Sequence, residues 1–318
     1  MKSVSEYIEE HKESFKDELF ELLRIPSIST DISKKEQVHN AADFLLSQMN
    51  ALDLDRAELF ETPGNPIVYG ELNVDDSRPT VLVYGHYDVQ PPDPEDLWET
   101  APFEPTVRNG SIYARGASDD KGQSFIHLKA VESYLKSGTG FPVNIKFIYE
   151  GEEEIGSPNL VPFIREHKEL LECDMVLISD TAMFAEDTPS ITYGLRGLAY
   201  MEVEVTGPNR DLHSGVYGGA VDNPANVLAD IISALKDEQG RILIDGFYED
   251  VKPLSDKERE AYKNLPFNEQ QYKKDLGLKA LQGEQGYSTL ERATARPALD
   301  VNGLWSGYQG EGAKTVLP

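Results

Sequence analysis

Acidic and imidazole groups follow three predicted strands, at the point where each strand ends. These groups are His86, the glutamate-rich run at residues 150–154, and Asp180. In an open α/β sheet the carboxyl ends of parallel strands meet at one edge, and ligands bind outside that edge. We therefore expect the imidazole and the carboxylates to converge in one crevice. A solvated turn after each strand is the alternative for any single residue, but it does not explain the three together.

Two further carboxylates, Asp119 and Asp120, lie between a short predicted strand at 111–114 and a helix that begins near Gly122. Carboxylates pooled in one site repel one another unless cations neutralise them. An imidazole with several carboxylates suits a divalent ion, for which zinc is the preferred candidate and manganese or cobalt are the alternatives. Two ions that share a bridging carboxylate fit the number of ligands better than one ion does.

Asp88 is placed to support His86. It lies two residues further on, and hence on the same side of the chain if the backbone stays extended. From there its carboxylate could accept the second N–H of the imidazole and fix the tautomer of the ring. A carboxylate in an ordinary turn is the alternative interpretation.

Alternating strands and helices are predicted from the N-terminus to about Tyr193. Apolar runs typical of strands buried on both faces occupy residues 80–84, 144–149 and 174–179. Helical patterns cover 122–136, before a possible C-cap at Gly138, and 160–171. This order predicts βαβ units and an α/β fold with a mostly parallel sheet.

The pattern changes in the second part of the chain. Residues 198–205 alternate as a half-buried antiparallel strand should, and Asp222 can cap a helix with Pro224 in its first turn. Capping boxes that start further helices are formed by Ser255 with Glu258 and by Ser288 with Glu291. We therefore expect a first domain at 1–193, which carries the metal ligands, and an α+β domain at 194–318.

Composition excludes several classes of partner. The 318 residues include 39% hydrophobic residues, enough for a core, and carry a net charge of −26. Such a charge repels nucleic acid and anionic membrane surfaces. No stretch approaches the ~20 apolar residues of a membrane span, and residues 1–23 predict an amphipathic helix rather than a signal peptide. Cys173 is the only cysteine, which fits a reducing, cytoplasmic compartment.

Four motifs carry a family resemblance. GHYDVQP at 85–91, RGASDDKG at 115–122, EGEEEIGS at 150–157 and ISD at 178–180 resemble the co-catalytic metallopeptidases of the aminoacylase, carboxypeptidase G and carnosinase type. Two more, YGLRG at 193–197 and DLHSGVYGG at 211–219, are similar to the carnosinase and cytosolic nonspecific dipeptidase branch. The resemblance covers nearly the whole chain. It implies a catalytic α/β domain of the zinc-peptidase type with an inserted α+β lid and dimerisation domain.

The resemblance also implies a role for each matching residue. His86 and Asp180 would bind one metal ion, and Glu154 would hold the second. Asp119 would bridge both ions. Glu153 would be the general base, which takes a proton from the metal-activated water that attacks the scissile carbonyl.

His213 is assigned by resemblance alone, since a histidine beside serine and glycine is otherwise an ordinary loop residue. The matching histidine in the lid polarises the substrate carbonyl, and in dimers it reaches the partner's active site. The resemblance therefore implies a homodimer formed through the lid. Arg196 is left open between a structural role and contact with the substrate carboxylate.

The chain departs from the family pattern at its end. Family members carry one more metal-binding histidine in a C-terminal segment, and none of the six histidines here can be assigned to it. Residues 312–318 resemble the entrance to a lid strand, so we expect this sequence to be a truncated fragment with both domains incomplete. Such a fragment would bind one metal ion better than two and would be weakly active or inactive.

The leading hypothesis is a metal-dependent dipeptidase that acts on small peptides. An N-acyl-amino-acid deacylase or desuccinylase with the same metal centre is the rival enzyme. A non-catalytic protein that associates through its lid is the alternative from another class, although binding alone needs no base such as Glu153.

Overall fold

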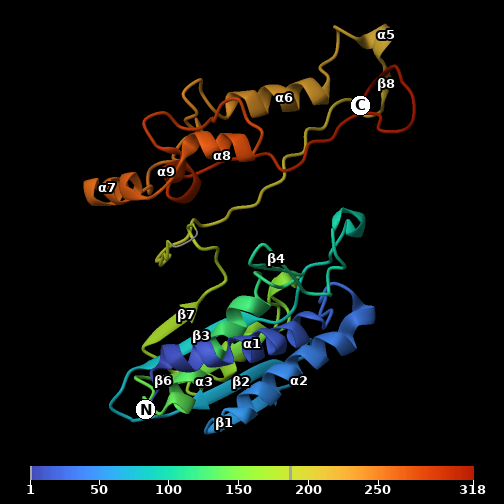
Figure 1. Ribbon diagram of the computed structural model, residues 1–318. Coiled ribbons are helices and arrows are strands. Elements are labelled where there is room, and N and C mark those ends of the chain that lie inside the picture. Colours follow the sequence, from blue (N-terminus) through green and yellow to red (C-terminus); the bar gives the residue numbers. More distant parts are fainter. Residues whose placement is uncertain (1, 186–187) are drawn as a thin grey trace. The chain divides into compact units, whose positions relative to one another are not determined.

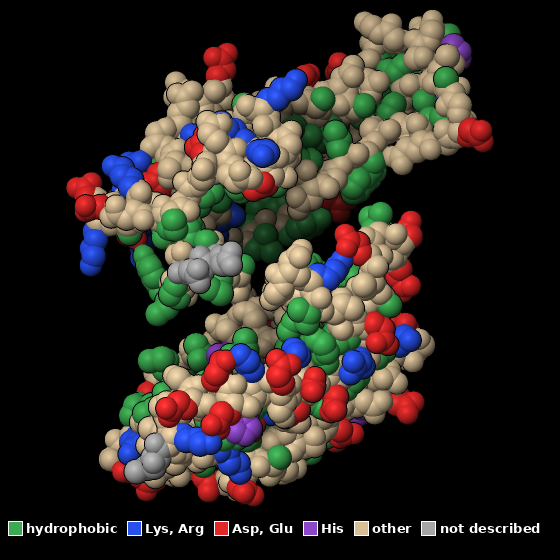
Figure 2. Space-filling model, viewed as in Figure 1, with side chains coloured by type: hydrophobic (Ala, Val, Ile, Leu, Met, Phe, Trp, Pro, Cys, Tyr) green, Lys and Arg blue, Asp and Glu red, His purple; other side chains and the backbone are tan. Residues whose placement is uncertain are grey.

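The computed structural model describes residues 2–185 and 188–318 and contains two compact units (Figure 1). Unit 1 is Met1–Met183 and unit 2 is Phe184–Pro318. The domain boundary predicted from the sequence falls slightly later, between residues 193 and 194, and stays a prediction. Figure 2 shows acidic side chains, interspersed with basic ones, over the visible face of unit 1.

Unit 1 is built on one five-stranded sheet with the order β1-β2-β6-β3-β7. Its strands are β1 (Arg56–Phe60), β2 (Ile67–Leu72), β3 (Thr80–His86), β6 (Asn144–Glu150) and β7 (Met175–Ile178). Strand β3 runs parallel to both β6 and β7, whereas β2 runs antiparallel to β1 and β6. The α/β fold is therefore confirmed, but the sheet is mixed rather than mostly parallel. The short connection from β1 to β2 allows only an antiparallel pair, because a parallel crossover needs a dozen or more residues.

Helices cover both faces of this sheet. They are α1 (Val4–Leu23), α2 (Lys35–Ala51), α3 (Lys121–Ser137) and α4 (Leu160–Glu166). Strand β6 alternates between the two faces: Phe147 packs in the cluster that includes α2 and α3 residues, and Ile148 packs with Phe163 of α4. This alternation follows from the two-residue period of a strand. The predicted C-cap is confirmed, because Gly138 has a φ of 73° at the end of α3.

Short elements complete unit 1. They are η1 (Ile32–Lys34), η2 (Glu95–Leu97), β4 (Thr106–Arg108), β5 (Ser111–Tyr113) and η3 (Glu153–Ile155). Helix α4 is shorter than the pattern at 160–171 predicts, because the backbone leaves the helical region at His167. Within the described residues, no helix combines the length and apolar character that crossing a membrane requires.

Strand β7 corrects one prediction. The sequence predicts burial on both faces, but all four residues of β7 are exposed, from 39% at Leu177 to 61% at Met175. The reason is position: β7 is an edge strand that pairs with β3 alone in the described sheet. An apolar run predicts a strand but does not supply the neighbours that bury it.

Unit 2 consists of short helices and one two-stranded pair. Its elements are β8 (Leu212–His213), α5 (Ser214–Tyr217), α6 (Pro224–Ala234), α7 (Asp256–Asn264), α8 (Glu269–Asp275), α9 (Thr289–Thr294) and β9 (Val316–Leu317). Both predicted capping boxes are confirmed, at the starts of α7 and α9. The cap of α6 is Asn223 rather than the predicted Asp222, because the side chain of Asn223 accepts the N–H of Ala225.

The predicted strand at 198–205 is wrong. These residues have no assigned secondary structure, and Tyr200 and Met201 are 79% and 82% exposed. A strand needs a neighbour for its backbone N–H and C=O groups, and in the described part of unit 2 only β8 and β9 form a ladder. Alternation by itself therefore did not create a sheet.

Candidate metal centre

His86 is the centre of the site. It is the last residue of β3, lies opposite Glu150 of β6 in the parallel ladder, and is fully buried. Its Nδ1 lies 3.0 Å from the backbone oxygen of Asp88. If Nδ1 donates its proton to that carbonyl, the lone pair of Nε2 is free to bind a metal ion.

Two carboxylates face that nitrogen. The Nε2 atom of His86 lies 3.1 Å from Oδ1 of Asp119 and 3.7 Å from Oδ2 of Asp180. Ligand atoms of these three residues all lie within 4.8 Å of one another. An imidazole nitrogen with two carboxylate oxygens is a donor set that suits zinc and similar divalent ions. The structure therefore brings together the three side chains that the sequence predicts for the first metal ion.

A second cluster shares the same histidine. Ligand atoms of His86, Glu153 and Glu154 also lie within 4.8 Å of one another. The resemblance pairs Glu154 with Asp119 as the bridge, whereas this cluster joins both glutamates to His86. The bridging role of Asp119 and the number of ions remain predictions.

Asp88 positions both parts of the site. Its carboxylate is fully buried and accepts the backbone N–H of Glu153 at 3.2 Å and of Glu154 at 3.1 Å. On the other side, Oδ1 lies 3.4 Å from Nδ1 of His86, while the backbone oxygen of Asp88 is nearer to that nitrogen. The sequence predicted contact with the imidazole but not the bonds to the start of η3.

Removing this carboxylate is expected to destabilise the fold. Asp88→Ala leaves two N–H groups without their charged acceptor, so we expect a loss of about 1–3 kcal/mol in the free energy of unfolding. Asp88→Asn should lose less, because the amide oxygen can still accept one bond. Urea unfolding of the metal-free protein measures both; equal stability of the alanine variant and the unchanged chain would contradict the contact.

The structure also sorts the run of glutamates. Glu150 is buried and accepts bonds from the hydroxyls of Tyr84 at 2.6 Å and Ser157 at 2.8 Å. Glu152 is buried and accepts a bond from Nδ2 of Asn159 at 2.7 Å. These hydrogen bonds hold the segments on either side of η3 in place. Glu153 and Glu154, the first two residues of η3, remain available to the site. Sequence reasoning missed both structural roles, because their partners are distant in the chain or ordinary in type.

Burial and neighbouring carboxylates shift the pKa values of the site. Burial raises the pKa of Glu153 and of Glu154. Burial also raises the pKa of Asp120 to about 6, although its Oδ2 accepts the backbone N–H of His86. Burial alone would lower the pKa of His86, but Asp88 and the other carboxylates raise it to about 10. A bound cation would balance the same negative charge, so the residues present fit a metal ion.

His213 lies in unit 2. Its Nδ1 accepts the backbone N–H of Gly215 at 3.0 Å, and its Nε2 lies 3.2 Å from the hydroxyl of Thr315. These contacts give it a local role at the start of α5. Its contact with a substrate carbonyl stays a prediction.

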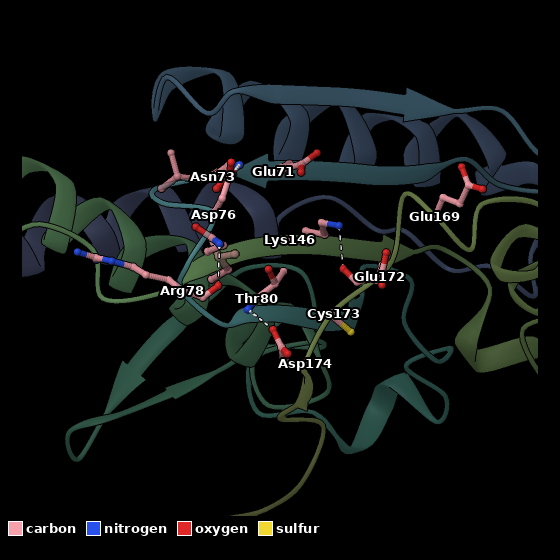
Figure 3. Close-up of a pocket in the computed structure, with 13 residues that line it drawn as sticks. Glu71, Asn73, Asp76, Arg78, Thr80, Lys146, Glu169, Glu172, Cys173 and Asp174 are labelled. Atoms are coloured by element: carbon pink, nitrogen blue, oxygen red, sulfur yellow. Dashed lines mark hydrogen bonds between the residues drawn. The ribbon is translucent and has the colours of Figure 1, made fainter.

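A cavity lined by the starts of the parallel strands is separate from the candidate metal centre. It measures about 370 Å³ and includes Thr80, Asn144 and Asp174 (Figure 3). Thr80 begins β3 and His86 ends it, so this cavity and the candidate metal centre lie at opposite ends of the strand. Two of its charged side chains have partners within the protein: Lys146 donates to two backbone oxygens, and Asp174 accepts the N–H of Thr80.

Comparison with known proteins decides the family. The model of peptidase family M20/M25/M40 matches residues 82–295, which include all the candidate metal ligands. The chain belongs to this family. The resemblance predicted from its motifs is confirmed, and membership makes the chain a metallopeptidase, a hydrolase of peptide bonds.

Individual M20 relatives match over almost the whole chain. A Cys-Gly metallodipeptidase of Schizosaccharomyces pombe is 37% identical over 98% of this chain and 68% of its own length. The structure of an M20 metallo-carboxypeptidase, Sso-CP2 of Sulfolobus solfataricus, is 39% identical with a TM-score of 0.77, over 94% of this chain and 67% of that one. Human carnosine dipeptidase 1 is 29% identical with a TM-score of 0.76, over 99% and 69%. The α/β fold is thus that of M20 peptidases.

Proposed function

We propose that this M20 peptidase hydrolyses dipeptides in a reaction that depends on divalent metal ions. The observation that carries the proposal is the approach of Asp119 and Asp180 to Nε2 of His86, with Glu153 at the same edge of the sheet. One charged cluster thus combines metal ligands with a candidate base.

Each side chain has a defined task in this proposal. His86, Asp119 and Asp180 would hold one ion, and Glu154 with Asp119 would hold a second; zinc is preferred, with manganese or cobalt as alternatives. When bound, a divalent ion polarises the scissile carbonyl and lowers the pKa of water. Glu153 accepts the proton of the attacking water and then delivers it to the leaving amine. His213 would stabilise the developing oxyanion.

The relatives favour a small peptide as substrate. Two of those compared above are named as dipeptidases and one as a carboxypeptidase. The rival deacylase or desuccinylase and the non-catalytic hypothesis draw no support from them. Cys-Gly and carnosine are named for two of the relatives. The substrate side chains that this enzyme prefers are tested with a panel of dipeptides.

Turnover of a substrate panel tests the proposal. Purified chain, freed of metal and reloaded with zinc, manganese or cobalt, is offered Cys-Gly, β-Ala-His, N-acetyl and N-succinyl amino acids, and a peptide of six residues. We expect metal-dependent cleavage of the dipeptides. Faster cleavage of the acyl amino acids would support the deacylase instead, and dipeptide cleavage that persists after the metal is removed would overturn the proposal. Metal counting on the same samples tests whether one ion or two are bound, and sedimentation tests the predicted homodimer.

The titration of Glu153 in the metal-free chain is expected to reflect its surroundings. Partial burial raises the pKa of this carboxyl, and Asp180 and Asp88 add to the rise against the charge of His86. We therefore expect Glu153 of the metal-free chain to titrate with a midpoint above the value of about 4.3 that an exposed glutamate shows. A bound cation would favour the ionised carboxylate and lower the midpoint again. NMR titration of the carboxyl carbon, identified by comparison with Glu153→Gln, measures the midpoint; a value at or below about 4.3 in the metal-free chain would contradict the burial of this carboxyl among other carboxylates.

A further inference from the structure

The ligands of the candidate metal centre are not held equally. His86 belongs to the ladder between β3 and β6, where its register partner is Glu150. Asp180 lies beyond the end of β7, and the ladder between β7 and β3 stops at Ile178, paired with Tyr84. Since β7 is also an exposed edge strand in the described sheet, the backbone around Asp180 needs another attachment if its carboxylate is to stay near His86.

His127 provides an attachment next to that ligand. Its Nε2 lies 2.7 Å from the hydroxyl oxygen of Ser179, the residue immediately before Asp180. A hydroxyl can donate or accept, so this bond forms with either tautomer of a neutral imidazole. His127 belongs to neither cluster of metal-ligand atoms, so its contact is with the loop and not with the metal site itself.

The helix that carries His127 is rigidly placed. Phe125 and Leu128, its neighbours on α3, are 2% and 1% exposed and belong to the main core cluster of unit 1. Asp119 lies just before the same helix. Helix α3 therefore follows one candidate ligand almost directly in the chain and contacts the loop of another through His127.

The charge of His127 also suits this place. Burial lowers the pKa of His127 from its usual range, so the ring is neutral near pH 7. A neutral ring adds no positive charge that would oppose a bound cation.

We infer that His127 is a positioning residue of the metal centre, which through Ser179 holds the loop that presents Asp180 to the ion. This inference rests on the proposed function, because it takes Asp180 as a metal ligand. A single hydrogen bond contributes about 0.5–1.5 kcal/mol, so its loss should weaken metal affinity by about two- to tenfold.

Zinc titration calorimetry on the metal-free 318-residue chain tests the inference. The variants are His127→Ala, Ser179→Ala and the double variant, with Ser179→Thr to restore a hydroxyl. His39→Ala is the matched control, because the Nδ1 of His39 likewise makes a hydrogen bond, to the backbone oxygen of Lys35 in its own helix, but away from the candidate ligands. Asp180→Asn shows how much zinc affinity is lost when a ligand carboxylate is removed. Thermal melting without metal shows which variants are folded.

We expect both single variants to bind zinc two- to tenfold more weakly, the double variant to bind no more weakly than either, and Ser179→Thr to bind like the unchanged chain. Affinities equal to that of His39→Ala, or losses that add in the double variant, would overturn the inference. If His127→Ala fails to fold, the comparison of Ser179→Ala with Ser179→Thr decides alone. Unchanged affinity of Asp180→Asn would instead refute the ligand set and with it the proposed function.

Discussion

Glu153→Gln is expected to lower kcat for dipeptide cleavage by about 10²–10⁴-fold while metal affinity stays close to that of the unchanged chain. Glutamine keeps the size and polarity of the side chain but cannot accept the proton of the attacking water. The backbone of Glu153 is bonded to the buried carboxylate of Asp88, so the substitution should leave η3 in place. Steady-state kinetics and zinc titration on the same preparation measure the two effects.

A second variant, Glu154→Gln, distinguishes the general base from the metal ligand. Both glutamates belong to the cluster around His86, and geometry alone does not separate base from ligand. We expect Glu154→Gln to weaken metal binding, and Glu166→Gln, an exposed position at the end of α4, to change neither quantity. If Glu153→Gln loses metal and Glu154→Gln retains it, the two roles are exchanged.

His86→Ala is expected to have the largest effect on metal binding. His86 is the one residue common to both clusters of ligand atoms found among the described residues. Loss of an outer partner of a ligand typically costs 10–100-fold in metal affinity, so loss of the ligand itself should cost more than about 100-fold. Cleavage of dipeptides should fall below detection with it. Metal content after dialysis and kinetics check both expectations.

The matched control for this variant is again His39→Ala. Because His86 is fully buried, circular dichroism and thermal melting must show that the variant still folds. A folded His86→Ala chain that keeps its full metal content would contradict the proposed centre.

The sequence predicted best those parts of the site whose location depends on their position along a strand. The apolar runs that became β3 and β6 could be recognised locally, and in parallel strands their carboxyl ends meet at the same edge. The sequence therefore predicted that His86 and the glutamate run lie close together. The capping boxes of α7 and α9 were predictable for the same reason, since each depends on residues three positions apart.

Predictions failed where the outcome depends on distant neighbours. The run at 174–179 formed a strand, but its burial depends on what lies beside β7, and in the described sheet only β3 pairs with it. The alternating stretch at 198–205 pairs with no other described strand, and residues 198–204 are exposed. The sheet is mixed because β2 enters it antiparallel to β6, an arrangement that the apolar pattern of β6 does not encode.

By itself the sequence determined the family and predicted the candidate ligands and their order, because these reside in residue type and spacing. Only the tertiary structure decided that Glu150 and Glu152 secure η3 and that Asp88 bonds to its first residues. Four neighbouring glutamates have the same chemistry, and each acquires its task from the partner that folding places beside it. Such partners lie as far away as Tyr84, on a different strand, so no local pattern could identify them.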